Sequence, residues 1–225
     1  AIFLATRLVE VERAEAIFTK ERESATDDEA KARLLWYHAT CTRQREDVEE
    51  DAWLEELKTL AETYPEAYWG GVARDRRRAL EQKAGDAAIP FRSTTLDGAP
   101  LALADLEGKV VLVEFWGEHA DRAAPFLVKL HEDFAARGLS IVGVAAVLDR
   151  ARATALVQAS KRSWPQLFDG RGPSTDLALR WGIERLPEFV LIDRKGKLVL
   201  PNAWLADAAG RTELRAAILR ALSAL

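Results

Sequence analysis

The sequence predicts an α/β protein with a central mixed β-sheet flanked by helices, preceded by a small all-α domain. Residues 1–86 carry apolar side chains at helical spacing, whereas short apolar runs alternate with helical segments over residues 87–225. The 225 residues, 48% of them apolar, also provide enough apolar side chains for two cores. We therefore expect a helical hairpin or bundle domain over residues 1–86 and an α/β domain over residues 87–225.

Three helices are expected in the first domain. Thr26 and Glu29 have the spacing of a capping box, in which a hydroxyl and a carboxylate each accept a hydrogen bond from a backbone N–H, so a helix should start there. A second amphipathic helix is expected over residues 51–63 and ends before Pro65, because the residue before a proline disfavours helix. A third is expected to begin at Pro65 and to stop near Gly85.

Strands and helices alternate in the second domain. Asp97-Gly98 favours a tight hairpin turn, and Val110–Trp116 is an apolar run typical of a strand buried on both faces. The later elements are expected as a helix over 125–136, a strand over 139–146, helices over 150–160 and 177–181, strands over 189–193 and 198–200, and a helix over 211–222. A β-α-β unit followed by an antiparallel hairpin predicts a mixed sheet.

Composition and charge argue against several classes of function. The net charge of −4, with both signs mixed along the chain, gives no electrostatic footprint for nucleic acid or for an anionic membrane surface. The apolar start of the chain meets Arg7 and Glu10 too soon for a membrane span, and we expect no transmembrane segment. The three histidines lie far apart without companions at ligand spacing, so we expect neither a metal site nor a cofactor.

Several stretches of the second domain occur together, in the same order, in a known family. They are Leu96–Gly98, Leu101–Trp116, Leu130–Glu132, Ile141–Val144 and Trp181–Asp193. On these residues the chain, from about residue 88 to its end, resembles thioredoxin-like proteins, and more narrowly the TlpA/ResA-type thiol-disulfide oxidoreductases and related redoxins. The resemblance implies a thioredoxin-like sheet, a protein or peptide partner that carries a thiol or disulfide, and an exported, periplasmic location.

The resemblance also implies where the chemistry takes place. In that family a Cys-x-x-Cys pair follows the Phe-Trp end of a strand, at a helix N-terminus that lowers the pKa of the first thiol. Here Phe115-Trp116 leads into a degenerate redox loop without cysteine, which contains Glu118, His119, Ala120, Asp121 and Arg122. Without gaps, Ala120 and Ala123 take the cysteine positions. Counted back from Pro125, the loop is about three residues shorter than the family pattern.

Two explanations for the missing pair stay open. In one, the chain has lost its cysteines and keeps the fold as a redox-inactive binding or scaffold protein that uses the Trp116/Pro187 face. In the other, the printed sequence omits residues after His119, Asp121 and Ala123, including two cysteines that flank Ala120-Asp121. The absence of methionine favours omission, because ordinary usage gives about four or five in this length. The presence of Cys41 favours loss. Disulfide exchange is expected only if the two cysteines exist.

Individual candidates for the site carry alternative interpretations. Glu114 occupies the place of the family's buried acid, which assists proton transfer, and a structural ion pair with a lysine or arginine is the competing interpretation. Trp116, Leu186 and Pro187 are the candidates for partner binding, although an aromatic residue at a strand end is as often core. The resemblance implies a cis peptide bond before Pro187. Glu118 and His119 could form an acid/base pair, but we favour their interpretation as loop residues at a helix start. Cys41 is expected to be an inert buried thiol.

Overall fold

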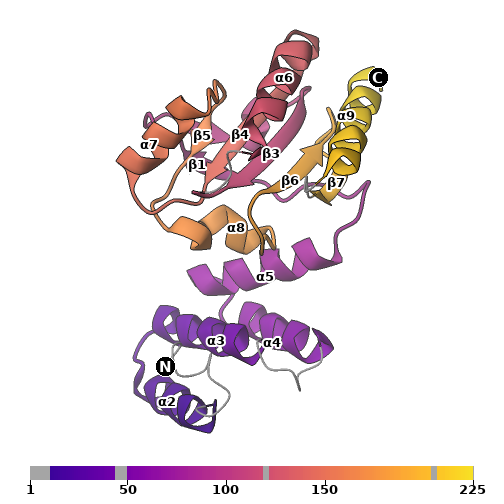
Figure 1. Ribbon diagram of the computed structural model, residues 1–225. Coiled ribbons are helices and arrows are strands. Elements are labelled where there is room, and N and C mark those ends of the chain that lie inside the picture. The colour runs from indigo at the N-terminus through magenta and orange to yellow at the C-terminus, as the bar shows by residue number, and fades with distance from the viewer. Residues whose placement is uncertain (1–10, 44–49, 119–121, 204–206, 225) are drawn as a thin grey trace. The chain divides into compact units, whose positions relative to one another are not determined.

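The structure is a computed structural model that describes residues 11–43, 50–118, 122–203 and 207–224. Contacts between Cα atoms divide the chain into two compact units, residues 1–81 and 82–225. The described part of the first unit contains the helices α2 (Val11–Ser24), α3 (Asp28–Thr42), α4 (Glu50–Thr63) and α5 (Tyr68–Glu81) (Figure 1). The first unit is therefore helical, and α4 matches the predicted helix over residues 51–63 within one residue.

The start of α3 differs from the predicted capping box. Asp27 is the N-cap, and its carboxylate accepts a hydrogen bond from the backbone N–H of Ala30 at 2.7 Å. Asp27 therefore takes the cap that was predicted for Thr26, because an aspartate caps at least as well as a threonine and lies one residue nearer the helix. The Glu29 carboxylate accepts instead from the backbone N–H of Tyr68, 39 residues further along the chain.

The third predicted helix is displaced at both ends. It begins at Tyr68 rather than Pro65, because the backbone first closes a turn in which the Ala67 N–H donates to the Tyr64 carbonyl at 3.2 Å. It ends at Glu81 rather than near Gly85. Gly85 already belongs to the second unit, and its N–H donates to the Leu198 carbonyl of the same unit at 2.8 Å. The residues that follow Glu81 thus belong to the edge of the sheet.

The second unit contains the sheet and its helices. In chain order these are β1 (Arg92–Thr94), β2 (Pro100–Ala102), β3 (Val110–Trp116), α6 (Ala124–Phe134), β4 (Leu139–Ala145), α7 (Arg150–Ala159), β5 (Gln166–Leu167), α8 (Asp176–Arg180), β6 (Glu188–Ile192), β7 (Leu198–Ala203) and α9 (Ala208–Ser223), with short 3₁₀ turns at Leu103–Leu106, Ala135–Arg137 and Gly172–Ser174. β1 and β2 form a separate antiparallel hairpin around the predicted Asp97-Gly98 turn.

The central sheet has the strand order β5-β4-β3-β6-β7. β3 pairs in parallel with β4 and antiparallel with β6, and β6 pairs antiparallel with β7, which confirms the predicted mixed sheet. All seven residues of β3 are buried, as expected for a central strand covered on both faces. The strand β5 was not predicted, because its two residues are too short to show a period.

The helices lie on both faces of this sheet (Figure 1). Leu127 of α6 and Ile218 of α9 belong to one core cluster with Leu112 of β3. The crossovers β3-α6-β4 and β4-α7-β5 run in the same direction along the sheet, so right-handed connections place α6 and α7 on the same face. On the opposite face, Trp181 at the end of α8 packs against Phe115 with ring centroids 5.8 Å apart. The end of β3 is therefore enclosed from both sides.

Candidate functional site

The candidate site begins where β3 ends. Gly117 is half-buried and Glu118 is exposed directly after the strand, and Arg122 is exposed shortly before α6. The Glu118 carboxylate lies 3.9 Å from the guanidinium of Arg152. The predicted candidates His119, Ala120 and Asp121 lie outside the described residues, so the centre of the predicted loop carries no structural description.

The loop before β6 forms the second side of the site. The peptide bond between Leu186 and Pro187 is cis, as the resemblance implies. Leu186 and Pro187 are both half-buried. A Cβ atom placed on Gly117 would lie 3.2 Å from Cδ1 of Leu186, so the turn after β3 and the proline loop are in contact. The structure therefore brings together candidates that are about 70 residues apart in the sequence.

Trp116 supports the site from inside the unit. Its side chain is 1% exposed and packs with Ala153 and Leu156 of α7. Its indole Nε1–H donates to the Gln166 Oε1 atom at 2.8 Å, and the guanidinium carbon of Arg162 lies 4.8 Å from the ring centroid. In this conformation the ring is fixed beneath the turn and is not presented at the surface.

Glu114 lies two residues before Trp116 in a fully buried position. Nη2 of Arg162 donates to its carboxylate at 2.9 Å and Nε donates at 3.2 Å, and both side chains are at most 1% exposed. Burial raises the pKa of Glu114 above its ordinary value, and the hydrogen bonds and charge of Arg162 oppose that shift. The acid predicted at this position is therefore one member of a buried ion pair.

A second acid stands next to the cis proline. Glu188 is half-buried at the start of β6, where it pairs in register with Phe115. Burial raises the pKa of Glu188, and hydrogen bonding from the backbone at Arg185 opposes the shift. Sequence reasoning missed this residue, because a single glutamate at the start of an apolar strand resembles many surface positions.

Arg162 and Gln166 were also missed by sequence reasoning. Arg162 reaches the site from the segment between α7 and β5, and Gln166 is the first residue of β5. Neither position carries a recognisable motif. One signal was available in Gly143, because a glycine within a buried strand indicates the close approach of another group. A Cβ atom on Gly143 would lie 1.9 Å from the Gln166 Oε1 atom, so the glycine makes room for the side chain that holds Trp116.

The described residues place neither a thiol nor a metal-binding cluster at this turn. Cys41 is buried in α3 of the helical unit. Among the described residues, no three histidine, cysteine, aspartate or glutamate side chains gather closely enough to hold a metal ion. The described helices also include none that is long and apolar enough to cross a membrane. Disulfide exchange at this turn requires thiols, and the described residues of the turn include no cysteine.

Comparison with known proteins identifies similar sequences and folds. The sequence profile of the Redoxin family matches residues 83–201. The thiol-disulfide oxidoreductase ResA of Halalkalibacterium halodurans is 29% identical over 120 residues, which are 52% of this chain and 66% of that protein, just under two thirds of its length. A ResA of Bacillus cereus is 25% identical over 135 residues, which are 59% of this chain and 74% of that protein.

Solved structures show the same fold. A thiol:disulfide interchange protein from a Bacteroides species superposes with a TM-score of 0.51 and 25% identity over 59% of this chain and 89% of its own. The thioredoxin domain of a thiol-disulfide oxidoreductase from Bacteroides vulgatus gives a TM-score of 0.52 at 24% identity, over 60% of this chain and 99% of its own. The second unit therefore has a thioredoxin-like fold.

Proposed function

Because the chain belongs to the Redoxin family, we propose that it is a protein of the ResA-type thiol-disulfide oxidoreductase class that binds polypeptides at the turn between β3 and α6. The partner carries a thiol or a disulfide, and exchange takes place only if two cysteines flank Ala120-Asp121. One observation carries the proposal. The contact between Gly117 and Leu186 brings the turn after β3 against cis-Pro187, and this juxtaposition supports the proposal that a partner binds across both segments.

With a cysteine pair at the turn, the exchange balances in two steps. The thiolate of one cysteine attacks a sulfur of the partner disulfide, which forms a mixed disulfide and releases the other partner sulfur as a thiolate. The second cysteine, as its thiolate, then attacks the mixed disulfide. The partner leaves as a dithiol after taking up two protons, and the cysteine pair is left as a disulfide. The partner is reduced by two electrons, which the pair supplies.

A second function is favoured by the position of the one printed cysteine. Cys41 belongs to the helical unit and is 5% exposed, so the printed sequence supplies no thiol at the turn. A chain with this sequence would use the face beside Pro187, with Trp116 as its buried support, for binding alone and without electron transfer. The domain boundary at residue 86 and the exported location remain predictions under both functions.

Restoring the cysteine pair tests the proposal. The variant carries cysteine insertions after His119 and Asp121 and a methionine insertion after Ala123, and its matched control carries serines in place of both cysteines. We expect the cysteine variant to reduce insulin disulfides in the presence of dithiothreitol, and the serine control to match the reaction without protein. A folded variant with two additional titratable thiols and no insulin reduction would contradict the proposal.

The same assay separates the two alignments of the loop. The double substitution Ala120→Cys and Ala123→Cys introduces the pair without lengthening the chain. If the loop has lost three residues, we expect this variant to be less active than the insertion variant, because α6 then begins too close to the pair. Equal activity of the two variants would favour the ungapped alignment.

A further inference from the structure

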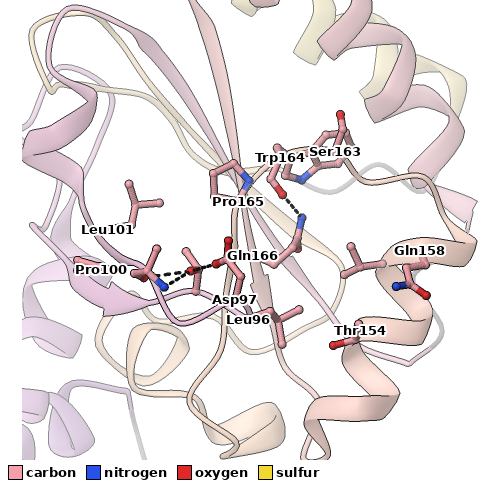
Figure 2. Close-up of a pocket in the computed structure, with 13 residues that line it drawn as sticks. Leu96, Asp97, Pro100, Leu101, Thr154, Gln158, Ser163, Trp164, Pro165 and Gln166 are labelled. Atoms are coloured by element: carbon pink, nitrogen blue, oxygen red, sulfur yellow. Dashed lines mark hydrogen bonds between the residues drawn. The ribbon is translucent and has the colours of Figure 1, made fainter.

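A pocket of about 590 Å³ lies at the edge of the sheet beside β5 (Figure 2). We call it the hairpin–α7 pocket, because Leu96 of the β1–β2 hairpin lines one side and Val157 of α7 lines the other. The segment Trp164–Gln166 lies between the two sides. The volume falls within the range of about 300–1,000 Å³ that is typical of ligand-binding pockets. The pocket is separate from the turn after β3.

One carboxylate lines the hairpin–α7 pocket. Among the described residues that line it, Asp97 is the one with an ionisable side chain. The hydroxyl of Thr95 donates a hydrogen bond to its carboxylate and lowers the pKa of Asp97, so the carboxylate is charged at neutral pH. The other polar side chains that line the pocket, such as Gln158 and Ser163, are neutral. A described cation in contact with the wall is Arg150, whose guanidinium is outside the lining and donates to the Leu96 carbonyl.

Gln166 links the pocket to the candidate site. The residue is 4% exposed, and its Nε2 donates to the Trp164 carbonyl at 3.0 Å while its Oε1 accepts from the Trp116 indole at 2.8 Å. A molecule that fills the pocket therefore contacts a residue bonded to Trp116. The indole N–H signal of Trp116 provides a reporter for occupancy.

The pocket also lies within reach of a polypeptide at the turn. β5 is two strands away from β3 in the sheet, and strands are about 4.8 Å apart, so the edge at β5 lies about 10 Å from β3. An extended chain advances about 3.3 Å per residue, so about three to four residues cover that distance. Pro187 precedes β6, which is one strand further from β5, so that distance is about 14 Å and a partner bound at Pro187 needs about four to five residues to place a side chain in the pocket.

We propose that the hairpin–α7 pocket binds a lysine or arginine side chain of the polypeptide partner. Both side chains bury an apolar stem while keeping their charged end in a polar environment. Leu96 and Val157 would cover the stem, and Asp97 would accept the charged end. That the occupant is a polypeptide rests on the proposed function, and its positive charge follows from the carboxylate in the pocket.

The test uses two blocked pentapeptides and the full chain labelled with ¹⁵N. One peptide is Gly-Val-Lys-Val-Gly, and the other has glutamate in place of lysine. We expect the lysine peptide to shift the indole signals of Trp116 and Trp164 and to leave those of Trp36, Trp53 and Trp69 in the helical unit unchanged. The glutamate peptide should bind at least fivefold more weakly, and equal binding of both peptides would overturn the proposal.

Charge variants on α7 locate the binding. Gln158 lines the pocket and is exposed, so Gln158→Lys places a cation in the pocket without burying it, and Ala155→Lys adds the same charge at an exposed position outside it. We expect Gln158→Lys to weaken the lysine peptide at least fivefold and Ala155→Lys to change its affinity less than twofold. Asp97→Asn should weaken it by about twofold to fivefold, as expected for an exposed ion pair. Equal losses in both lysine variants would contradict binding in the pocket.

The outcome is independent of the redox chemistry. If the cysteine insertion variant fails to reduce insulin while the lysine peptide binds as described, the proposed exchange is wrong and the pocket proposal stands. If that variant reduces insulin but no peptide shifts Trp116 or Trp164, the pocket proposal is wrong and the exchange stands.

Discussion

Replacing Arg162 tests how much the buried Glu114–Arg162 ion pair beneath the candidate site stabilises the fold. In the parent protein Arg162 neutralises Glu114, and both side chains are at most 1% exposed, with their closest atoms 2.9 Å apart. In Arg162→Met the carboxylate keeps its burial and loses its counter-ion. Breaking a buried pair in this way typically costs about 3–5 kcal/mol of unfolding free energy, and we expect a loss in that range at pH 7. Urea unfolding followed by circular dichroism measures it.

The pH dependence of this loss has a defined sign. Burial already raises the pKa of Glu114 above its ordinary value of 4.5, and without Arg162 the pKa rises further. The folded variant then holds a proton at Glu114 more tightly than the unfolded chain does. The unfolding free energy of the variant relative to the parent therefore rises as the pH falls from 7 toward 4.5. The difference between variant and parent should narrow over that range.

Two further variants separate the cost of an unpaired buried charge from the cost of losing the arginine side chain or an exposed ion pair. Glu114→Leu combined with Arg162→Met removes both charges, and we expect it to recover most of the loss and to remove its pH dependence. Arg180→Met breaks a more exposed pair with Asp176, whose side chains are 22% and 39% exposed, and should cost less than about 1 kcal/mol. A loss below about 1 kcal/mol in Arg162→Met, or no recovery in the double variant, would refute the reasoning.

Three other outcomes follow from the fold. Asp27→Ala should lower the unfolding free energy by about 1 kcal/mol and Thr26→Ala by much less, measured by urea unfolding, because Asp27 is the observed cap of α3. Gly143→Ala should cost about 1–3 kcal/mol in the same measurement, because its Cβ would lie 1.9 Å from Gln166. A fragment of residues 82–225 should unfold cooperatively by itself, and a fragment without a sharp transition would contradict the two-domain prediction.

The central elements could be predicted from the sequence because their patterns are local. Val110–Trp116 is a continuous apolar run, and the structure places a buried strand over those same residues. The helical segment over 150–160 was equally clear, and it forms α7. Pro65 shows the limit of such patterns. Proline is favoured at the first position of a helix, but the turn closed by Ala67 moves the start of the helix to Tyr68.

The candidate site was less accessible to sequence reasoning. Cis-Pro187 could be expected from the resemblance, but the partners of Glu114 and Trp116 come from a segment about 50 residues away. No spacing rule in the sequence connects Arg162 to Glu114. The two residues meet because β4 pairs with both β3 and β5, which brings the segment before β5 close to Glu114 of β3. The burial of Trp116 is also a tertiary property, since a tryptophan at a strand end occurs both at surfaces and in cores.

One measurement tests the central claim most directly, namely that exchange at the β3–α6 turn depends on a cysteine pair flanking Ala120-Asp121. Thiols are counted in a reduced, unfolded portion of the protein. Insulin reduction is measured on the folded protein from the same preparation. The account predicts that a chain with the single thiol Cys41 is inactive and that a chain with two further thiols at the turn is active. Insulin reduction by a chain with one thiol, or inactivity of a folded chain with three, would contradict it.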